Sequence, residues 1–197
     1  DLDFHQQTAD MAGVERRLAK TIGLGVMYGM GYNKMARELD IDPQDAKKML
    51  ADFRERVPFM QGMLEAVMNR ANSKGIIRTL LGRKCRFDLW EPTQWGVHKA
   101  LPHNQAKVEY GDAIKRAGTY KALNRLIQGS AADQTKKAMV DVYEELGVVP
   151  LIQVHDELDC SVKGEKEAKE IQRVMETCVE LEVPSKADID LGESWGG

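Results

Sequence analysis

Cysteines and long apolar runs are scarce in this chain, and both shortages limit what it can be. Among its 197 residues are 3 cysteines, at positions 85, 160 and 178, and none of them forms a Cys-x-x-Cys pair. Neither a disulfide framework nor a zinc site is therefore indicated, and a reducing cytoplasm is the natural setting. No apolar run is long enough to span a bilayer, so we expect no membrane partner.

The start of the chain lacks both an initiator Met and a signal-peptide pattern, because it opens in mid-pattern at Asp1. Although a chain of this length can bury a good core, its opening is that of a segment cut from a longer sequence. We therefore expect an excised fragment.

The chain also lacks an overall positive charge, since its formal net charge is -3. Its basic residues are nevertheless clustered, and the region after Asp141 is rich in acids. The clusters are Arg16, Arg17 and Lys20; Arg70, Lys74, Arg78, Arg83, Lys84 and Arg86; and Lys115, Arg116, Lys121 and Arg125. This distribution fits a DNA-binding surface together with metal-binding carboxylates, although solvated helix faces would give a similar pattern.

An unusual helical stripe lies near the start of the chain. Arg16, Lys20, Leu24 and Tyr28 follow one another at intervals of four residues, so they form one slowly winding stripe along a helix. The stripe presents two cations, then an aliphatic side chain, then an aromatic ring. This order suits a ligand that has phosphates at one end and a flat ring at the other, such as a nucleoside triphosphate.

The alternative is an ordinary amphipathic helix, in which the two cations are solvated and the leucine and tyrosine belong to the core. Gly23 and Gly25 weaken this alternative, because they reduce helix stability without any local benefit. The helix is also expected to end at Tyr28-Gly29, which would leave the Tyr28 ring at an open end. We therefore expect some group to approach this backbone closely.

The pattern Arg-x-x-x-Lys-x-x-x-x-x-x-x-Tyr-Gly, made by Arg16, Lys20, Tyr28 and Gly29, resembles motif B of the DNA polymerase I family (family A). The resemblance implies that a helix over residues 14–29 is the nucleotide-binding helix of the fingers. Single-subunit RNA polymerases carry a related motif, so the rest of the chain must distinguish the two families.

The preceding segment, residues 3–9, resembles the family's Asp-x-His-x-x-Thr-Ala, with His5 at the histidine position. The resemblance implies that His5 donates a hydrogen bond to the triphosphate beside Arg16 and Lys20. A lone histidine is otherwise most simply a surface or capping residue.

A basic hairpin is predicted from Ile76 to Phe87. Within it, Thr79, Gly82 and Arg83 resemble the family's Thr-x-x-Gly-Arg. Thr79 and Arg83 would then contact phosphates, which position a duplex without reading its sequence. Without the neighbouring motifs, this segment would be only an exposed basic hairpin.

Residues 124–133 resemble the family's Asn-x-x-x-Gln-Gly-x-Ala-Ala-Asp. Asn124 and Gln128 are four residues apart and share a helix face. Their amides suit minor-groove atoms, which look alike for every correct base pair, and would check pairing at the primer end. The family often has Arg four residues before the Asn, where this chain has Tyr120, so one primer-strand contact is in doubt.

Gln153-Val154-His155-Asp156-Glu157 lies between two short apolar strands and is predicted to form the turn of a hairpin. It resembles motif C of the family in its DNA polymerase form. The resemblance implies that Asp156 ligates Mg²⁺, that Glu157 has a lesser catalytic role and that His155 contacts DNA. Without the resemblance, this would be a solvated acidic turn.

Spacing and breakers predict the remaining elements. Helices are expected over 32–39, from Asp42 to just before Pro58, over 60–72, from about 110 to 146 with a break, and over 165–182. Residues 89–103 are predicted to be irregular and have no assigned role, and residues 187–191 are predicted to form a strand. The ending resembles the family's Gly-x-x-Trp, here Gly192 and Trp195.

The matches run in the family's order from residue 3 to residue 195. They imply a mainly helical α+β fold, consisting of the fingers and the C-terminal part of the palm of a right-hand polymerase, with a small antiparallel sheet that carries the motif C hairpin. Residues 1–110 would be fingers and residues 111–197 palm, while the thumb, motif A and any exonuclease domain are absent.

The implied reaction adds a deoxynucleotide to a primer 3′-hydroxyl by phosphoryl transfer with two Mg²⁺ ions, which need at least two carboxylates. This chain supplies Asp156, and Lys20 could protonate the leaving pyrophosphate. The family's second metal-binding Asp lies in motif A, before residue 1, so we expect the chain to be inactive alone. Its partners would be primer-template DNA, deoxynucleoside triphosphates and the remaining polymerase domain, in a bacterial or phage-infected cytoplasm.

Leu24 departs from the family, because bacterial members usually have Phe there and some phage members have Tyr. A branched aliphatic side chain cannot stack on a sugar and base as a ring does. Together with the short link after His5 and the unmatched residues 89–103, Leu24 suggests a phage or virus-like member.

Three alternatives remain at this stage. A single-subunit RNA polymerase would share the stripe, but Gln153-Val154 and the pair Asn124 and Gln128 favour DNA synthesis. A metal-dependent nuclease would use Asp156 and Glu157 but normally needs further carboxylates grouped in sequence. The fragment alone would be a non-catalytic DNA- or nucleotide-binding module with weak, salt-sensitive binding.

Overall fold

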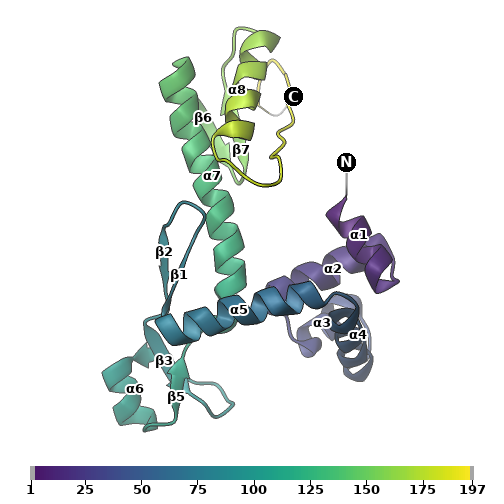
Figure 1. Cartoon of the computed structure of the whole chain (residues 1–197), viewed down its shortest axis with the longest axis vertical. Helices are drawn as coiled ribbons and strands as arrows, with labels where there is room; N and C mark the ends of the chain where they lie inside the picture. Colours follow the sequence, from purple (N-terminus) through teal and green to yellow (C-terminus); the bar gives the residue numbers. More distant parts are fainter. Residues whose placement is uncertain (1–2, 196–197) are drawn as a thin grey trace. The chain divides into compact units, whose positions relative to one another are not determined.

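The computed structural model describes residues 3–195 and is a mainly helical α+β fold (Figure 1). It divides into two compact units, each described by itself. Unit 1 comprises Asp1–Arg78 and Lys84–Leu126, and unit 2 comprises Thr79–Arg83 and Ile127–Gly197. In the described part of the chain, no helix is both long and apolar enough to cross a membrane.

The first half of unit 1 is helical. Its helices are α1 (Phe4–Ala12), α2 (Arg16–Met27), α3 (Tyr32–Leu39), α4 (Pro43–Arg56) and α5 (Pro58–Lys74). Local signals explain their ends: Asp42 accepts a hydrogen bond from the Gln44 N–H and Pro43 occupies the first turn of α4. Gly75, in the left-handed region at φ 68°, ends α5.

The helical core of unit 1 is formed by apolar side chains from all five helices and from the turns between them. Its buried members are Ala12, Ile22, Val26, Met30, Met35, Ala36, Ala46, Leu50, Phe53, Val57 and Met60. The predicted helices over these segments are confirmed, with ends within two residues of those expected for α3, α4 and α5.

A hairpin and a small sheet complete unit 1. Strands β1 (Ile76–Arg78) and β2 (Lys84–Arg86) pair antiparallel, as the sequence predicts. Strand β3 (Leu89–Pro92) lies between β4 (Leu101–Pro102) and β5 (Ile114–Arg116), and both of its neighbours are antiparallel to it. Helix α6 (His103–Tyr110) connects β4 to β5 and contacts the sheet.

Unit 2 is built on the long helix α7 (Ala122–Leu146), whose first residues belong to unit 1. Strands β6 (Pro150–Val154) and β7 (Glu157–Cys160) form the predicted hairpin, and helix α8 (Glu165–Thr177) follows it. Val142, Val148, Ile171 and Val174 form the buried core of this unit.

Three sequence predictions need correction. Residues 89–103 are not irregular throughout, because β3 finds its partners in Leu101 and in Ile114–Arg116. Pairing with a segment so distant in sequence leaves no local periodicity to detect. The second correction concerns the helix predicted from about residue 110. Helix α6 ends at Tyr110, because Gly111 turns the chain at φ 75°, and the next α-helix, α7, begins only at Ala122.

The third correction concerns the end of the chain. Residues 187–191 alternate polar and apolar residues but form no strand, and α8 ends at Thr177 rather than near residue 182. The side chains of α8 take the place of a neighbouring strand: Gln172 Nε2 donates to the Ala187 carbonyl at 2.5 Å, and Glu176 accepts from the Ala187 N–H at 3.0 Å.

The three cysteines are free thiols. Burial raises the pKa of the Cys160 thiol, and it does the same for Cys178. A raised pKa keeps both side chains protonated and poorly nucleophilic at neutral pH.

Candidate functional site

Helix α2 turns its unusual stripe away from the core. Arg16 and Lys20 are exposed, whereas Leu24 and Tyr28 are half-buried. Neither of the last two belongs to the buried core cluster, to which α2 contributes Ile22 instead. Because Ile22 lies about 160° around the helix from Lys20 and from Leu24, the stripe and the core occupy different faces. The structure therefore disfavours the interpretation of Leu24 and Tyr28 as core residues.

The glycines of α2 are close to other parts of unit 1. A Cβ atom on Gly25 would lie 1.9 Å from Met30 Cε, and one on Gly23 would lie 3.5 Å from Met60 Cε. The chain folds back over Gly25 to Met30, whose N–H donates to the Gly25 carbonyl at 2.7 Å, so a larger residue at position 25 would displace the end of the Met30 side chain. The expected close approach to this backbone is confirmed, and the approaching group is the protein core.

Gly29 ends α2 for two structural reasons. Its φ of 72° lies in the left-handed region, and a Cβ atom there would be 2.9 Å from the Tyr120 carbonyl oxygen. Tyr120, which stands where the family often has Arg, thus lies against the end of α2. Its ring is 5.4 Å from Lys121 Nζ, so this position presents a ring and a neighbouring cation.

Asp3 connects His5 to Arg16. One oxygen of its carboxylate accepts from the His5 N–H at 2.9 Å, and the other accepts from Arg16 Nε at 2.8 Å and Nη2 at 2.6 Å. The hydrogen bond from Arg16 is the main cause that lowers the pKa of Asp3. Asp3 was not predicted as a site residue, although it caps the helix that carries His5.

The turn Thr79–Arg83 at the tip of hairpin β1–β2 packs against α7 within unit 2. Arg83 Nε donates to Asp133 Oδ1 at 2.7 Å, and Arg83 Nη2 donates to the Gly129 carbonyl at 2.8 Å. The Leu80 N–H donates to Ser130 Oγ at 3.0 Å. The structure thus brings Thr79 and Arg83 together with the second half of the Asn-x-x-x-Gln-Gly-x-Ala-Ala-Asp motif.

Burial shapes the chemistry of this turn. Thr79 and Asp133 are each 6% exposed, whereas half of the Arg83 side chain remains exposed. Burial alone would raise the pKa of Asp133, but hydrogen bonds from Thr79 and Arg83, with the Arg83 charge, lower it overall. Asp133 is therefore a buried, ionised partner of Arg83 that sequence reasoning did not identify.

Gly129 is part of the same arrangement. A Cβ atom on Gly129 would lie 2.8 Å from Thr79 Cγ2 and 3.3 Å from Arg83 Nη2. Gly129 and Asp133 are four residues apart on α7 and so share a face. This spacing of a glycine and a carboxylate is the sequence signal that could have indicated a docking site for another segment.

The first half of that motif lies on α7 as predicted. Asn124 is half-buried and Gln128 is exposed, and one helical turn separates them. Their predicted minor-groove contacts stay a prediction.

The predicted motif C turn is the tip of hairpin β6–β7. Val154 pairs with Glu157, so His155 and Asp156 form a two-residue turn. His155 has φ 53°, in the left-handed region, and its carbonyl accepts a hydrogen bond from Gln153 Nε2. Asp156 and Glu157 are exposed. The turn therefore presents two neighbouring carboxylates to solvent.

Carboxylate oxygens are suitable ligands for a hard cation such as Mg²⁺, so Asp156 fits one position in a metal site. Among residues 3–195, however, no group of three or more His, Cys, Asp or Glu side chains is arranged to hold a metal ion.

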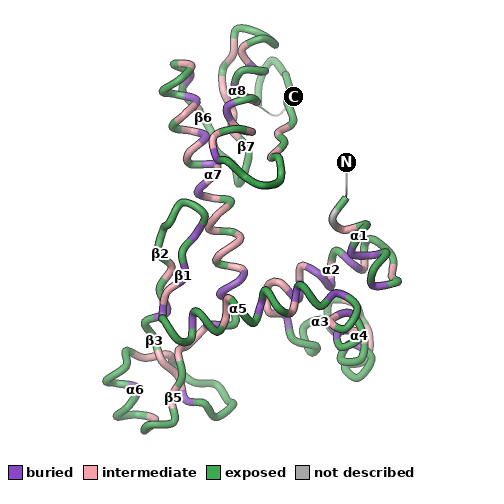
Figure 2. The backbone as a smooth tube through the Cα atoms, viewed as in Figure 1, coloured by how far each residue is buried: buried purple, intermediate pink, exposed green. Residues whose placement is uncertain are grey.

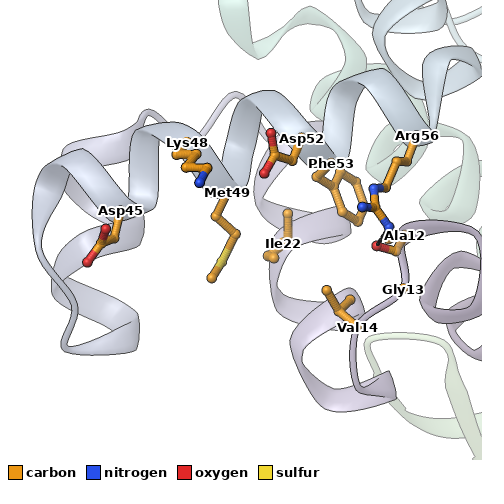
Figure 3. Close-up of a pocket in the computed structure, with 10 residues that line it drawn as sticks. All are labelled: Ala12, Gly13, Val14, Ile22, Asp45, Lys48, Met49, Asp52, Phe53 and Arg56. Atoms are coloured by element: carbon orange, nitrogen blue, oxygen red, sulfur yellow. Dashed lines mark hydrogen bonds between the residues drawn. The ribbon is translucent and has the colours of Figure 1, made fainter.

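A cavity of about 340 Å³ opens on the other side of α2 (Figure 3). Ile22, Met49 and Phe53 form its apolar wall, and Asp45, Lys48 and Asp52 are among its charged residues. Arg56 Nη1 donates to the Ala12 carbonyl at 3.0 Å at one end. Because Ile22 lies on the core face of α2, this cavity is separate from the stripe.

Comparisons with known proteins agree with these motifs. A DNA-directed DNA polymerase of Pseudomonas phage M6 is 38% identical over 98% of this chain and 31% of its own length. A thermostable DNA polymerase I of Thermus thermophilus is 32% identical over 98% of the chain and 23% of its own length.

A solved structure is also similar: the POL domain of Pol1 from M. smegmatis in complex with DNA primer-template and dNTP. It matches with a TM-score of 0.70 at 29% identity, over 92% of this chain and 32% of that one. The chain thus spans about a third or less of these relatives. The family model described as DNA polymerase family A matches residues 1–197, and the chain belongs to that family.

Proposed function

We propose that this chain carries the fingers and the C-terminal part of the palm of a DNA polymerase, with residues 1–110 as fingers and 111–197 as palm. In the intact protein it takes part in template-directed DNA synthesis, in the cytoplasm of a bacterial or phage-infected cell. The observation that carries the proposal is the cationic, then apolar stripe of α2, which faces away from the core in a chain that matches the family along its whole length.

The stripe binds the incoming nucleotide. Arg16 and Lys20, both exposed, neutralise the triphosphate, and His5 donates a hydrogen bond to it. Leu24 and Tyr28 shape the pocket for the new base pair, and Gly29 allows the helix to end there. Asp3 holds Arg16 in place before the nucleotide arrives, since its carboxylate already binds the guanidinium.

In the reaction, the primer 3′-hydroxyl loses its proton to solvent as its oxygen attacks the α-phosphorus of the nucleotide, and the bond between this phosphorus and pyrophosphate breaks. Lys20 donates a proton to the leaving pyrophosphate. Two Mg²⁺ ions, when bound, stabilise the attacking and leaving oxygens. Asp156 would hold one of these ions, and Glu157 would act beside it in a lesser role.

Several predicted residues hold the DNA. Asn124 and Gln128 check the minor groove of the primer end, and His155 contacts the DNA beside the motif C turn. Of the pair Thr79 and Arg83, Arg83 is the better phosphate ligand, because half of its side chain is exposed while Thr79 is buried.

The hairpin β6–β7 supports a further partner, the rest of the polymerase domain. Leu151, Ile152 and Val154 on β6 are 64%, 40% and 37% exposed, although apolar strands normally bury one face. A two-stranded sheet is at best marginally stable alone. We propose that the motif A segment covers this sheet and supplies the second metal-binding carboxylate, so the chain alone is inactive.

Leu24 distinguishes this chain from relatives with a ring at that position. Replacement by Phe restores stacking, which contributes about 0.5–1.5 kcal/mol, or roughly a 2- to 10-fold change in incorporation of sugar-modified nucleotides. Equal kinetics for wild type and Leu24→Phe would exclude this role.

The test is primer extension by a chimera in which this chain replaces the matching segment of the phage M6 polymerase. With Mg²⁺ and deoxynucleotides, the chimera extends a labelled primer, and the chimera with Asp156→Asn does not. The chain alone binds primer-template without extending it. Extension by the Asp156→Asn chimera at the wild-type rate would refute the proposal, and a preference for ribonucleotides would favour an RNA polymerase relative.

A further inference from the structure

The connection between β3 and β4, residues 93–100, was left without a role by the sequence motifs. It is exposed from Thr93 to Lys99 (Figure 2). We call it the Trp95 loop, after the residue at its centre.

Both ends of the Trp95 loop are fixed to unit 1. At one end, the Ala113 carbonyl accepts from the Thr93 N–H at 2.8 Å and from the Thr93 hydroxyl at 3.1 Å. At the other, the Tyr110 hydroxyl donates to the Lys99 carbonyl at 3.0 Å, and the His98 and Tyr110 rings are 5.8 Å apart in an edge-to-face contact. The loop is thus a supported structure.

The middle of this supported loop presents apolar side chains to solvent. Trp95 is 97% exposed and Val97 is exposed to 105% of its reference area. Trp90, only five residues earlier, shows the usual behaviour: it is half-buried, with Arg116 at 4.7 Å from its ring and His103 at 4.7 Å on its edge. The same small sheet therefore uses one indole for packing and holds another in solvent.

The charge around the Trp95 loop indicates the charge of the partner that would contact the exposed indole. No Asp or Glu occurs between Glu91 and Glu109, although the chain contains 31 acids. Of the bordering acids, Glu91 is in an ion pair with Lys115 at 3.7 Å, and Glu109 is exposed at the far end of α6. The next acid, Asp112, is paired with Lys107 at 3.0 Å. Lys99 is exposed on the loop itself. An anionic partner is therefore favoured.

We propose that the Trp95 loop binds single-stranded nucleic acid, with a base stacked on Trp95 and a phosphate beside Lys99. An unpaired base offers a free ring face, whereas the bases of a duplex are covered by their neighbours. Stacking accepts any base, and one nearby cation attracts the backbone without selecting a sequence. This contact is additional to the primer-template contacts of the proposed polymerase and does not depend on catalysis.

The test compares Trp95→Ala with Trp195→Ala, which removes a second exposed indole, 66% exposed, in unit 2. Binding of fluorescein-labelled oligothymidylate and of a blunt duplex is measured by anisotropy at several salt concentrations. Trp95→Ala weakens oligothymidylate binding roughly 10-fold and leaves duplex binding unchanged. Trp195→Ala binds both as the wild type does.

A further variant, Lys99→Gln, lowers the salt dependence of oligothymidylate binding by about 0.7 in the log–log slope. Thermal unfolding confirms that each variant is folded. Wild-type affinity of Trp95→Ala for oligothymidylate overturns the inference, as does an equal loss with Trp195→Ala or on the blunt duplex. A wild-type chain that binds no single strand also overturns it, whereas failure of the chimera to extend a primer refutes only the proposed polymerase function.

Discussion

Two hairpins of this protein have turns that resemble family motifs, and the two turns differ in their exposure and in their hydrogen bonds to the rest of the protein. In hairpin β1–β2, the polar groups of Thr79–Arg83 are bonded to one another and to α7. In hairpin β6–β7, His155 and Asp156 form an exposed turn, with Glu157 exposed beside them.

The backbone conformations of the two turns also differ. The first turn has Gly82 at φ 82°, where glycine adopts the left-handed conformation without strain. The second turn has His155 at φ 53°, where any side chain is strained. Such strain is commonly stored at functional sites. We therefore expect the first turn to contribute mainly to stability, beside the proposed phosphate contact of Arg83, and the second turn to contribute mainly to the proposed reaction. The predictions below test that division.

The largest effect is expected at the exposed turn His155–Asp156, which we call the open turn. Asp156→Asn in the phage M6 chimera removes the proposed metal ligand, and we expect this loss to be worth several kcal/mol of transition-state stabilisation and to lower the extension rate about 10³-fold. Because Asp156 is exposed, thermal unfolding of the isolated chain is unchanged. Single-turnover extension and calorimetry measure the two quantities, and a large loss of stability would mean that this turn is structural as well.

At the turn Thr79–Arg83, which we call the closed turn, a substitution is expected to change stability rather than activity. Asp133→Ala removes a buried carboxylate that accepts the Arg83 hydrogen bond, and the free energy of unfolding of unit 2 falls by about 2 kcal/mol. Asp112→Ala is the matched control, since it removes an ion-paired carboxylate whose side chain is 92% exposed and leaves stability unchanged. Urea denaturation compares them; equal midpoints for the two variants would contradict the structural role of Asp133.

The pH dependence of stability tests whether the charge of Asp133 stabilises the closed turn. The pKa of Asp133 is lowered in the folded protein, so its ionised form contributes stability above about pH 4, the ordinary aspartate range, and this contribution is lost as the pH falls through the folded pKa. Asp133→Asn lacks the contribution at every pH. The difference in unfolding free energy between wild type and Asp133→Asn is therefore largest near pH 7 and shrinks towards pH 3.

Urea denaturation at pH 7, 4 and 3 checks this difference. Asp112→Asn serves as the control, and its difference from wild type stays flat over the same range. A difference for Asp133→Asn that is as large at pH 3 as at pH 7 would show that its cause is lost packing, with no contribution from charge.

The contrast between the turns also explains what the sequence could predict. The ends of α4, the winding stripe of α2 and the hairpin β6–β7 depend on neighbouring residues, through caps, helical spacing and a short turn. All of them were expected from the residues alone. The family resemblance added roles, such as a metal ligand at Asp156, that an acidic turn does not indicate by itself.

What could not be predicted depends on residues far apart in the chain. The partner of Arg83 is Asp133, 50 positions later. In the same way, β3 pairs with Ile114–Arg116, and the segment after α8 is held by Gln172 rather than by a strand. A side-chain pattern in one segment does not show which distant segment will supply its partners, so these contacts appeared only in the folded structure.

The smallest effects on stability are expected from substitutions at the residues with positive φ in the two turns, and the two effects have opposite signs. Gly82→Ala forces a side chain into the left-handed region and destabilises the chain by about 1 kcal/mol. A Cβ atom at Gly82 would meet no other atom within 4 Å, so the cost comes from the backbone alone. His155→Gly relieves the corresponding strain but adds entropy to the unfolded chain, so it stabilises the protein by only about 0.5 kcal/mol.

The second variant separates stability from function. If the open turn retains His155 because it contacts DNA, His155→Gly raises the unfolding midpoint in urea while it weakens primer-template binding measured by anisotropy. Gly82→Ala lowers the midpoint, and its effect on binding follows the unfolded fraction only. A His155→Gly protein that is more stable and binds DNA as tightly as the wild type would remove the functional reason for the strained residue, and the two turns would then differ only in burial.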